Sequence, residues 1–374
     1  MTLRIPLAKP EITDADREAV QAVLNTASLS MGPKLPEFEQ AMASYVGSPF
    51  AVAVNSGTSA LHLAVKVLNL TPGAEVILPS FSFSAILNVV LQERLRPVFA
   101  EIDASTLNLT PESVQQALTP RTAAIIAVHT FGRPAAMGQL CAIAGERGIP
   151  LIEDACEALG AEVDGHRVGA LGKTSVLAFY PNKQITTGEG GMLLTANRDL
   201  AEHARRLRNQ GRDPALDWLQ HAELGYSYRL SEINCALGLA QLQRLEEIVQ
   251  RRQQLAAMYD AKLAGVAGII RPPLTLNRGR VSWFCYVVQL PAGVDATGRD
   301  WIVEELLGLG IQTGRYFAPL HRQPVMGGSA QANLPVTDSV AARALALPFF
   351  NQLKESEIEE VCEALAGLLA KLER

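Results

Sequence analysis

The chain has 374 residues, 48% of them hydrophobic, and a formal net charge of −5 at pH 7. This length and composition can bury a large core and favour two or three structural units. The lysines and arginines are scattered and form no basic stripe of the kind that follows a nucleic-acid backbone. Nucleic acid is therefore not an expected partner.

The N-terminal segment, the lengths of the apolar runs and the spacing of the cysteines and histidines argue against a secreted or membrane protein, a disulfide framework and a metal site. The segment Met-Thr-Leu-Arg-Ile-Pro lacks a basic region followed by an apolar core, and no apolar run approaches the ~20 residues that cross a bilayer. We therefore expect a cytoplasmic protein with no membrane partner. The five cysteines are widely spaced without a C-x-x-C pair, and the six histidines are dispersed. These spacings disfavour both a disulfide framework and a metal site.

Between residues 50 and 200, short β-branched runs alternate with helical patterns. This alternation is typical of parallel strands joined by crossover helices, so we predict an α/β core. The strands are expected at residues 51–54, 75–79, 97–102, 123–128, 151–153, 175–179 and 191–195. Thr110 and Ser231 are predicted to cap helices, with Pro111 at a first helical position where a missing N–H is tolerated.

The second half of the chain shows a different pattern. Apolar residues recur at helical spacing from Ser231 to about Met258, which predicts one long helix able to bridge two domains. Beyond it we expect a strand at 283–290, a helix at 300–309, a surface loop at 327–331 and a final helix at 357–372. These elements predict a smaller α+β domain. We place the large domain at residues 1–250 and the small one at 251–374.

The most informative stretch for function runs from Phe179 to Gly191 and sets Lys183 in a loop crowded with Gly and Thr. A lysine that forms a Schiff base needs a desolvated site, and small residues let a planar cofactor approach the backbone. The alternative is an ordinary surface lysine beside a turn.

Asp154 follows a predicted buried strand, at the edge of an α/β sheet where ligands bind. A carboxylate there favours a cationic partner. The pyridine nitrogen of pyridoxal phosphate (PLP) is such a partner, because pairing with a carboxylate keeps it protonated and makes the ring an electron sink. The alternative is that Asp154 caps the helix that follows.

Two further loops could complete a PLP site. Ser56, Gly57, Thr58 and Ser59 stand at a predicted helix N-terminus, where backbone N–H groups and hydroxyls cradle phosphate, although such residues also cap ordinary helices. The loop at 79–83 carries two aromatic rings, one of which could stack on a cofactor, although either ring could belong to the core.

In this order, the phosphate cradle, aromatic loop, aspartate and lysine resemble fold-type I PLP enzymes, specifically the DegT/DnrJ/EryC1/StrS family of sugar aminotransferases. The resemblance covers nearly the whole chain. It rests on the segments 32–34, 55–62, 79–83, 152–158, 179–191, 225–229 and 315–321. It implies a large domain with a mostly parallel seven-stranded sheet flanked by helices, followed by a smaller α+β domain.

The resemblance also assigns roles to individual residues. It implies that Lys183 forms the Schiff base, Asp154 holds the pyridine nitrogen, Phe83 stacks on the ring, and Gly57 and Thr58 bind the phosphate. In the family, the Gly-Tyr-x-Tyr-Arg segment reaches the neighbouring subunit's site, so Ser227 and Arg229 would act across a homodimer interface. The alternative for Arg229, from the sequence alone, is an ordinary solvated charge at the entrance of a helix.

Three positions depart from the usual pattern of the family. Glu157, which we expect among the residues at the cofactor, stands where His or Gln is usual; a carboxylate there could favour the protonated cofactor, or it could point away. Ala178 stands where many members place a phosphate-binding Ser, and Ser227 replaces the Asn of the usual Gly-Tyr-Asn-Tyr. The expected contacts to the phosphate therefore rest on fewer side chains than in many relatives.

The family's reaction implies that an amino acid, glutamate by resemblance, donates its amino group to a nucleotide-linked keto-sugar, which we expect to be aminated at C4. The resemblance points to Ser30, Arg229, Arg315, Tyr316 and His321 as contacts for that substrate. Arg315 could instead form only a surface ion pair, and His321 could be an ordinary loop residue.

Three other functions stay open from the sequence. Relatives that deoxygenate sugars carry a histidine in place of the lysine, so Lys183 argues against that reaction. The chain could also be a non-catalytic regulator that binds a nucleotide-sugar or PLP. It could finally aminate a sugar at C3, a cyclitol or a small amino acid.

Overall fold

The computed structural model describes residues 3–213, 215–217, 220–327 and 332–372. Most of the loop expected at 327–331 lies outside these residues. Within the described ranges, no helix combines the length and the apolar character needed to span a bilayer.

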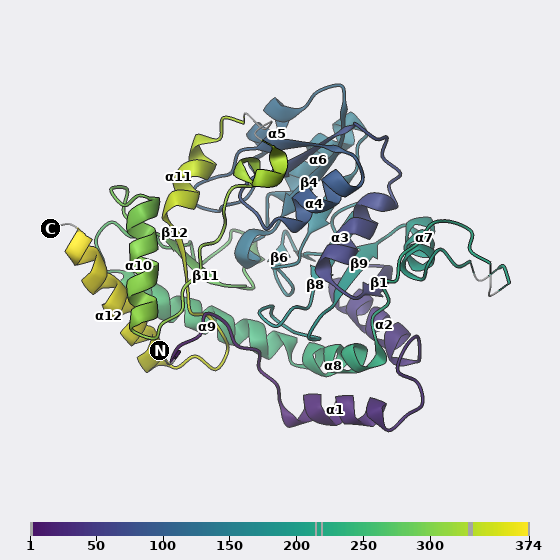
Figure 1. Ribbon diagram of the computed structural model, residues 1–374, viewed down its shortest axis with the longest axis horizontal. Coiled ribbons are helices and arrows are strands. Elements are labelled where there is room, and N and C mark those ends of the chain that lie inside the picture. The colour runs from purple at the N-terminus through teal and green to yellow at the C-terminus, as the bar shows by residue number, and fades with distance from the viewer. Residues whose placement is uncertain (1–2, 214, 218–219, 328–331, 373–374) are drawn as a thin grey trace.

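A seven-stranded sheet forms the centre of the molecule, in the order β1-β9-β8-β5-β4-β2-β3 (Figure 1). Its β9 is antiparallel to both neighbours, and the remaining neighbours pair in parallel. The predicted mostly parallel sheet is therefore confirmed. The strands are β1 (Phe50–Val54), β2 (Glu75–Pro79), β3 (Arg96–Ala100), β4 (Thr122–Val128), β5 (Leu151–Asp154), β8 (Thr174–Ala178) and β9 (Gly191–Thr195).

Helices cover both faces of this sheet, so most of its strands are buried on both sides. Val52 and Val54 of β1 join a core with α3 (Gly57–Lys66), α4 (Ala85–Gln92) and α7 (Arg198–Arg208). The alternate residues Ala51 and Ala53 pack on the opposite side. That side is covered by α2 (Lys34–Val46), α5 (Pro111–Ala117), α6 (Met137–Arg147), α8 (Glu232–Gln243) and α9 (Leu245–Leu263). On β1, the alternation of side chains thus divides the core between the two faces.

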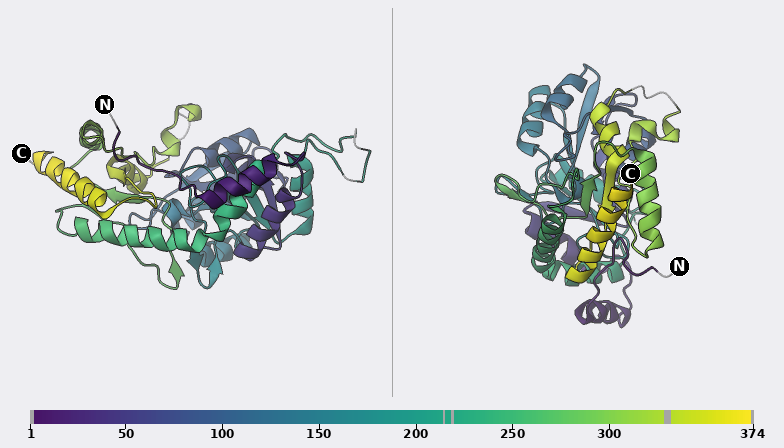
Figure 2. Two further views of the ribbon diagram at one scale, coloured as in Figure 1. Left: turned by 90° about the horizontal axis from the view of Figure 1, so that it is seen from below. Right: turned by 90° about the vertical axis from the view of Figure 1, so that its left-hand side faces the viewer.

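A second apolar core lies at the other end of α9 (Figure 2). It includes residues of β11 (Tyr286–Gln289) and β12 (Ala344–Leu347), which pair antiparallel, and of α10 (Ala296–Gly308) and α12 (Glu355–Leu372). The remaining elements are α1 (Asp14–Leu24), α11 (Pro335–Arg343), the short strands β6 (Glu162–Val163), β7 (His166–Arg167) and β10 (Gly279–Arg280), and 3₁₀ turns at Thr130–Gly132, Leu320–Arg322 and Pro324–Met326.

The single long helix expected from Ser231 to Met258 is instead two helices, α8 and α9. The break lies at Arg244, whose backbone leaves the helical region at φ −105° and ψ 6°. Both helices contribute to the same core, so the apolar spacing continues through the break and does not reveal it.

The strand expected from Trp283 is also shorter than predicted and begins at Tyr286. Trp283 has a positive φ of 56°, and its neighbours Ser282 and Phe284 donate their N–H groups to Gly132 and Phe131 instead of to a strand. The segment before β11 is therefore held against the end of β4.

Candidate active site

Strands β1, β2, β4, β5 and β8 all end at the same edge of the sheet, because they run parallel to one another. The turns that follow β1, β5 and β8 lie within contact distance there. A Cβ atom added to Gly57 would lie 2.6 Å from the Cβ of Ala178 and 3.5 Å from the Sγ of Cys156. The edge at which α/β sheets bind ligands thus brings together the segments that the sequence singles out.

Lys183 projects into this edge with only 13% of its side chain exposed, so it is not a surface lysine. Its Nζ lies 3.6 Å from Oε1 of Glu157 and 4.0 Å from the centre of the Phe284 ring. An amine in these surroundings is largely shielded from water and faces both a carboxyl group and an aromatic ring.

The loop that carries Lys183 is closed by its own backbone. Phe179 donates its N–H to Gly190 and accepts one from Thr187, and Lys183 donates its N–H to the carbonyl of Tyr180. A side chain at Gly190 would meet Oγ1 of Thr187 at 2.3 Å, so this close packing requires glycine. These bonds fix the position from which the lysine side chain extends.

Asp154 ends β5 and is 6% exposed. Its Oδ1 accepts the N–H of Cys156 at 3.0 Å, but residues 155–161, all of which the structure describes, contain no helix for it to cap. Burial raises the pKa of the Asp154 carboxyl, while the bonds from Cys156 and the charge of Lys183 oppose that rise. A cation at this carboxyl would relieve the cost of burying its charge.

The N-terminus of α3 offers backbone donors beside these two residues. Ser56 caps the helix, and its Oγ accepts the N–H of Ser59 at 3.0 Å. The N–H groups of Gly57 and Thr58 belong to the first turn, which has no carbonyl of its own helix to bond, and Thr58 is exposed. The helix dipole adds positive potential at the same point, as a phosphate requires.

The two aromatic rings of the loop after β2 differ in their surroundings. Phe81 is fully buried and packs edge-on against Phe131 and Phe317, so it belongs to the core. Phe83 is 62% exposed, which leaves its ring free to meet a ligand.

The segment at 225–229 lies beside the cradle of its own subunit. Asn55, which precedes Ser56, donates its N–H to the carbonyl of Tyr228 and its side-chain amide to the carbonyl of Ser227. Arg229 donates to Asn209 at 3.1 Å and to the hydroxyl of Ser227 at 3.0 Å. Within one chain, these bonds occupy part of the Arg229 guanidinium.

Ser30 and the residues of the late loop lie in different surroundings. Ser30 is exposed and forms a backbone bridge with Ser231, the cap of α8. Tyr316 stacks on Phe284 and thereby approaches Lys183. Arg315 pairs with Asp300 at 3.1 Å on the surface.

His321, the last of the predicted substrate contacts, is buried. Its Nδ1 lies 2.7 Å from Oγ of Ser80, and its Nε2 lies 3.4 Å from the Asp338 carboxylate. These contacts join the late loop to the end of β2.

Sequence reasoning missed three residues that help to position the lysine, two of them in the second half of the chain. Arg252 of α9 is buried and donates to the carbonyls of Trp283 and Phe284, which fixes the ring beneath Nζ of Lys183. Gln184 donates to the carbonyl of Glu157 at 2.7 Å. Phe284 lies in an apolar run that predicts only a core strand, so nothing local marks its role.

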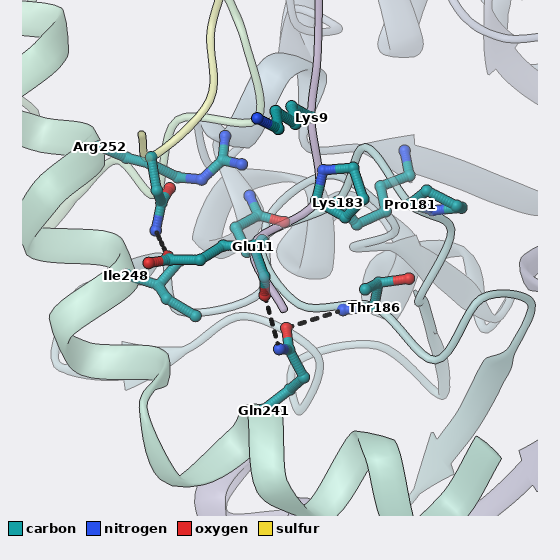
Figure 3. A pocket seen from close by; sticks show the side chains of 11 residues that line it. Lys9, Glu11, Pro181, Lys183, Thr186, Gln241, Ile248 and Arg252 are labelled. Carbon is teal, nitrogen blue, oxygen red and sulfur yellow. Dashed lines mark hydrogen bonds between the residues drawn. The ribbon is translucent and has the colours of Figure 1, made fainter. Parts of the chain in front are cut away.

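Arg252 and Lys183 also line a pocket between the N-terminal segment and α9 (Figure 3). Across this pocket, Gln241 donates to the carbonyl of Glu11 and accepts the N–H of Thr186. The N-terminal segment thus packs against the lysine loop.

The residues present fit PLP. An amine shielded from water suits its aldehyde, a buried carboxyl at a strand end suits its pyridine nitrogen, and a helix N-terminus whose first residue lacks a Cβ suits its phosphate. A Cβ at Gly57 would narrow the space between α3 and β8. The fold and the site together define a PLP-dependent enzyme of fold type I.

Known proteins agree with this class. GDP-perosamine synthase of Caulobacter vibrioides is 36% identical over 367 residues, covering 98% of each chain. The aminotransferase TlmJ of Streptoalloteichus hindustanus superposes with a TM-score of 0.93 at 33% identity, over 99% of this chain and all of that one. Spr1654 of Streptococcus pneumoniae, solved in a PLP form, gives a TM-score of 0.93 at 26% identity over 98% and 99% of the two chains.

Residues 10–366 match the DegT/DnrJ/EryC1/StrS aminotransferase family, and the chain belongs to it. It is therefore a PLP-dependent enzyme of a sugar-aminotransferase family.

Proposed function

We propose that this enzyme is a cytoplasmic homodimer that transfers an amino group from glutamate to C4 of a nucleotide-linked keto-sugar, in the biosynthesis of amino sugars and polysaccharides. One observation supports the reaction above all others. The amine of Lys183 is buried beside carboxyl groups at the sheet edge where α3 begins. The similarity to the GDP-perosamine synthase of Caulobacter supports the choice of a nucleotide-linked sugar.

Each residue of the site has a defined task in this proposal. Asp154 holds the pyridine nitrogen, Gly57 and Thr58 bind the phosphate, and Phe83 covers the ring. Bound PLP withdraws electrons from the carbon that carries the amino group. The Nζ of Lys183 would take the proton from that carbon of the donor and would hold it as an ammonium until it is released. In the second half-reaction, the same amine moves protons in the opposite direction for the keto-sugar.

On the substrate side, we assign Ser30, Arg315, Tyr316 and His321 to contacts with the nucleotide-linked sugar, with Arg229 reaching the site of the partner subunit. Ser227 acts with Arg229 at the same interface. Exposed apolar side chains support an interface, because Leu29 and Met31 flank Ser30 at 48% and 45% exposure and Leu224 stands near Ser227 at 84%.

The decisive experiment incubates the purified protein with PLP, glutamate and a panel of nucleotide-linked 4-keto and 3-keto sugars, and measures product masses. A mass change that corresponds to replacing the keto oxygen by an amino group, for a 4-keto sugar only, supports the proposal. The Lys183→Ala variant should make no product, while Lys173→Ala, at an exposed lysine before β8, should retain activity. Product from Lys183→Ala would remove the central assignment.

A further inference from the structure

Glu157 has one carboxyl oxygen held in place and the other directed at the reactive lysine. Its Oε2 accepts the N–H of Phe131 at 3.0 Å. The backbone carbonyl of Glu157 accepts the side-chain amide of Gln184, the neighbour of Lys183. Oε1 lies 3.6 Å from Nζ of Lys183. The two side chains are 10% and 13% exposed, so little water competes for either group.

Other titratable or charged groups surround this pair. They are Asp154 of β5, Cys156 in the next turn, Cys285 before β11, Tyr316 of the late loop and Arg252 of α9. Burial raises the pKa of both thiols well above the usual range and that of the phenol to about 12, so these groups are neutral near pH 7.

The remaining cation and carboxyl have other tasks. Burial lowers the pKa of Arg252 to about 10, which leaves it charged near pH 7, and it donates to the carbonyls of Trp283 and Phe284. Asp154 is the carboxyl assigned to the pyridine nitrogen. Lys9 and Glu11 also line the pocket beside Lys183, and the Glu11 carboxylate lies 3.8 Å from Arg244 and accepts the side-chain amide of Asn351. Among the described side chains, Glu157 is the carboxylate within ion-pair distance of Nζ of Lys183, so it is the anion that can balance the charge on this nitrogen.

We propose that Glu157 is the counter-ion of the Lys183 nitrogen, a positioning residue that acts through the lysine and sets how tightly this nitrogen holds its proton. The inference rests on the proposed role of Lys183. When Lys183 takes a proton, a C–H bond of the donor breaks and an N–H bond forms on Nζ, and the carboxylate of Glu157 stabilises the resulting ammonium.

Burial raises the pKa of the Glu157 carboxyl, and the charge of Lys183 opposes that rise. The carboxylate therefore depends on its cationic neighbour, as expected for a mutually stabilised pair.

The test is a pH titration of the visible absorbance that PLP develops when it joins a lysine. In Glu157→Gln, the amide oxygen still accepts the N–H of Phe131 but carries no charge. Loss of an opposite charge at this distance should lower the midpoint of the titration by about one pH unit or more. Glu157→Asp keeps the negative charge but places it farther from Nζ of Lys183, because the side chain is shorter. This variant should lower the midpoint by less.

The matched control is Glu162→Gln, five residues along the same segment. Glu162 pairs with Arg167 and Arg280 and should leave the midpoint unchanged. An unchanged midpoint in Glu157→Gln overturns the inference. If that variant does not fold, an unchanged midpoint in Glu157→Asp overturns it as well. Failure of wild-type protein to develop the absorbance would instead contradict the role of Lys183 itself.

Discussion

In the proposed mechanism, two side chains at the same sheet edge have opposite roles. Lys183 supplies an amine that burial and the Phe284 ring keep away from water. Asp154 supplies a carboxyl whose pKa burial raises, and which a cation would return to its charged form. The two side chains differ in how they are held, because Lys183 lies on a loop and Asp154 ends a strand.

Replacing Asp154 by Asn tests the charge alone. Asparagine keeps the size and can still accept the N–H of Cys156, but it cannot hold a protonated pyridine nitrogen. We expect the variant to retain some PLP and to lose turnover by about a hundredfold or more, as measured in a steady-state transfer assay. Asp164→Asn, at an exposed aspartate paired with Arg278, is the control and should behave as wild type. Near-normal turnover would mean that Asp154 only orders its turn.

Gly57→Ala tests the cradle for the phosphate. The added methyl group would lie 2.6 Å from the Cβ of Ala178, so α3 must shift away from β8. We expect the dissociation constant for PLP to rise at least about tenfold, which corresponds to 1.4 kcal/mol. In equilibrium dialysis, unchanged binding would show that the phosphate lies elsewhere.

A control for this substitution is Gly367→Ala, inside α12. Apart from the adjacent residues and the nearby backbone of the helix itself, nothing lies within 4 Å of the added methyl group there. Since alanine favours a helix over glycine, this variant should gain about 0.5–1 kcal/mol in unfolding free energy and bind PLP normally.

Among the elements, β5 places a buried acid on each of its faces. Next to Asp154, Glu153 accepts bonds from the backbone of Gly169, Leu171 and Gly172, from Ser175 and from His129. His129 accepts the N–H of Ala135 at Nδ1, so its Nε2 carries the proton donated to Glu153. This network holds the turn at 169–172 against the strand that ends in Asp154.

Glu153→Gln should destabilise the fold by about 3 kcal/mol, because an amide nitrogen would face donors in a buried site. Burial raises the pKa of Glu153, but the bonds from His129 and its other donors lower it overall. The carboxylate therefore contributes stability above the unfolded pKa of about 4.3, and this contribution is lost as pH falls through the lower folded value.

Urea denaturation at neutral and acidic pH measures both effects. Glu37→Gln, at an exposed ion pair with Lys34, should change stability by less than about 1 kcal/mol. Equal stability of wild type and Glu153→Gln at neutral pH would contradict this account.

Local patterns in the sequence predicted some elements and residues well. Thr110 and Ser231 cap their helices as expected, and β9 spans its predicted residues. The places of Lys183 and Asp154 at the sheet edge could be predicted, because Asp154 ends β5 and Lys183 follows β8 within a few residues, whereas their roles stay predictions. Phe284 and the contact between Glu157 and Lys183 could not, because they depend on how distant segments pack. For the same reason, nothing in the sequence showed that His321 would be bonded to Ser80.

At the scale of the whole molecule, α9 connects two apolar cores. Leu245, Ile248 and Val249 pack with the main sheet, whereas Leu255 and Tyr259 pack with β11 and α12 (Figure 2). The division of the chain at residue 250 stays a prediction, and it would fall within this helix.

A homodimer is the second prediction at this scale. Light scattering should give about twice the chain mass of 40.2 kDa. If Arg229 acts in the partner's site, a mixture of Arg229→Ala and Lys183→Ala chains should recover part of the activity, because one site of each mixed dimer would be intact. A monomer, or no recovery in mixed dimers, would contradict shared sites.

The most direct measurement is borohydride reduction of the PLP-loaded protein, followed by peptide mass mapping. Reduction fixes the cofactor to the amine that holds it. The account predicts a label on Lys183 and on no other lysine. A label at another position, or no label at all, would contradict it.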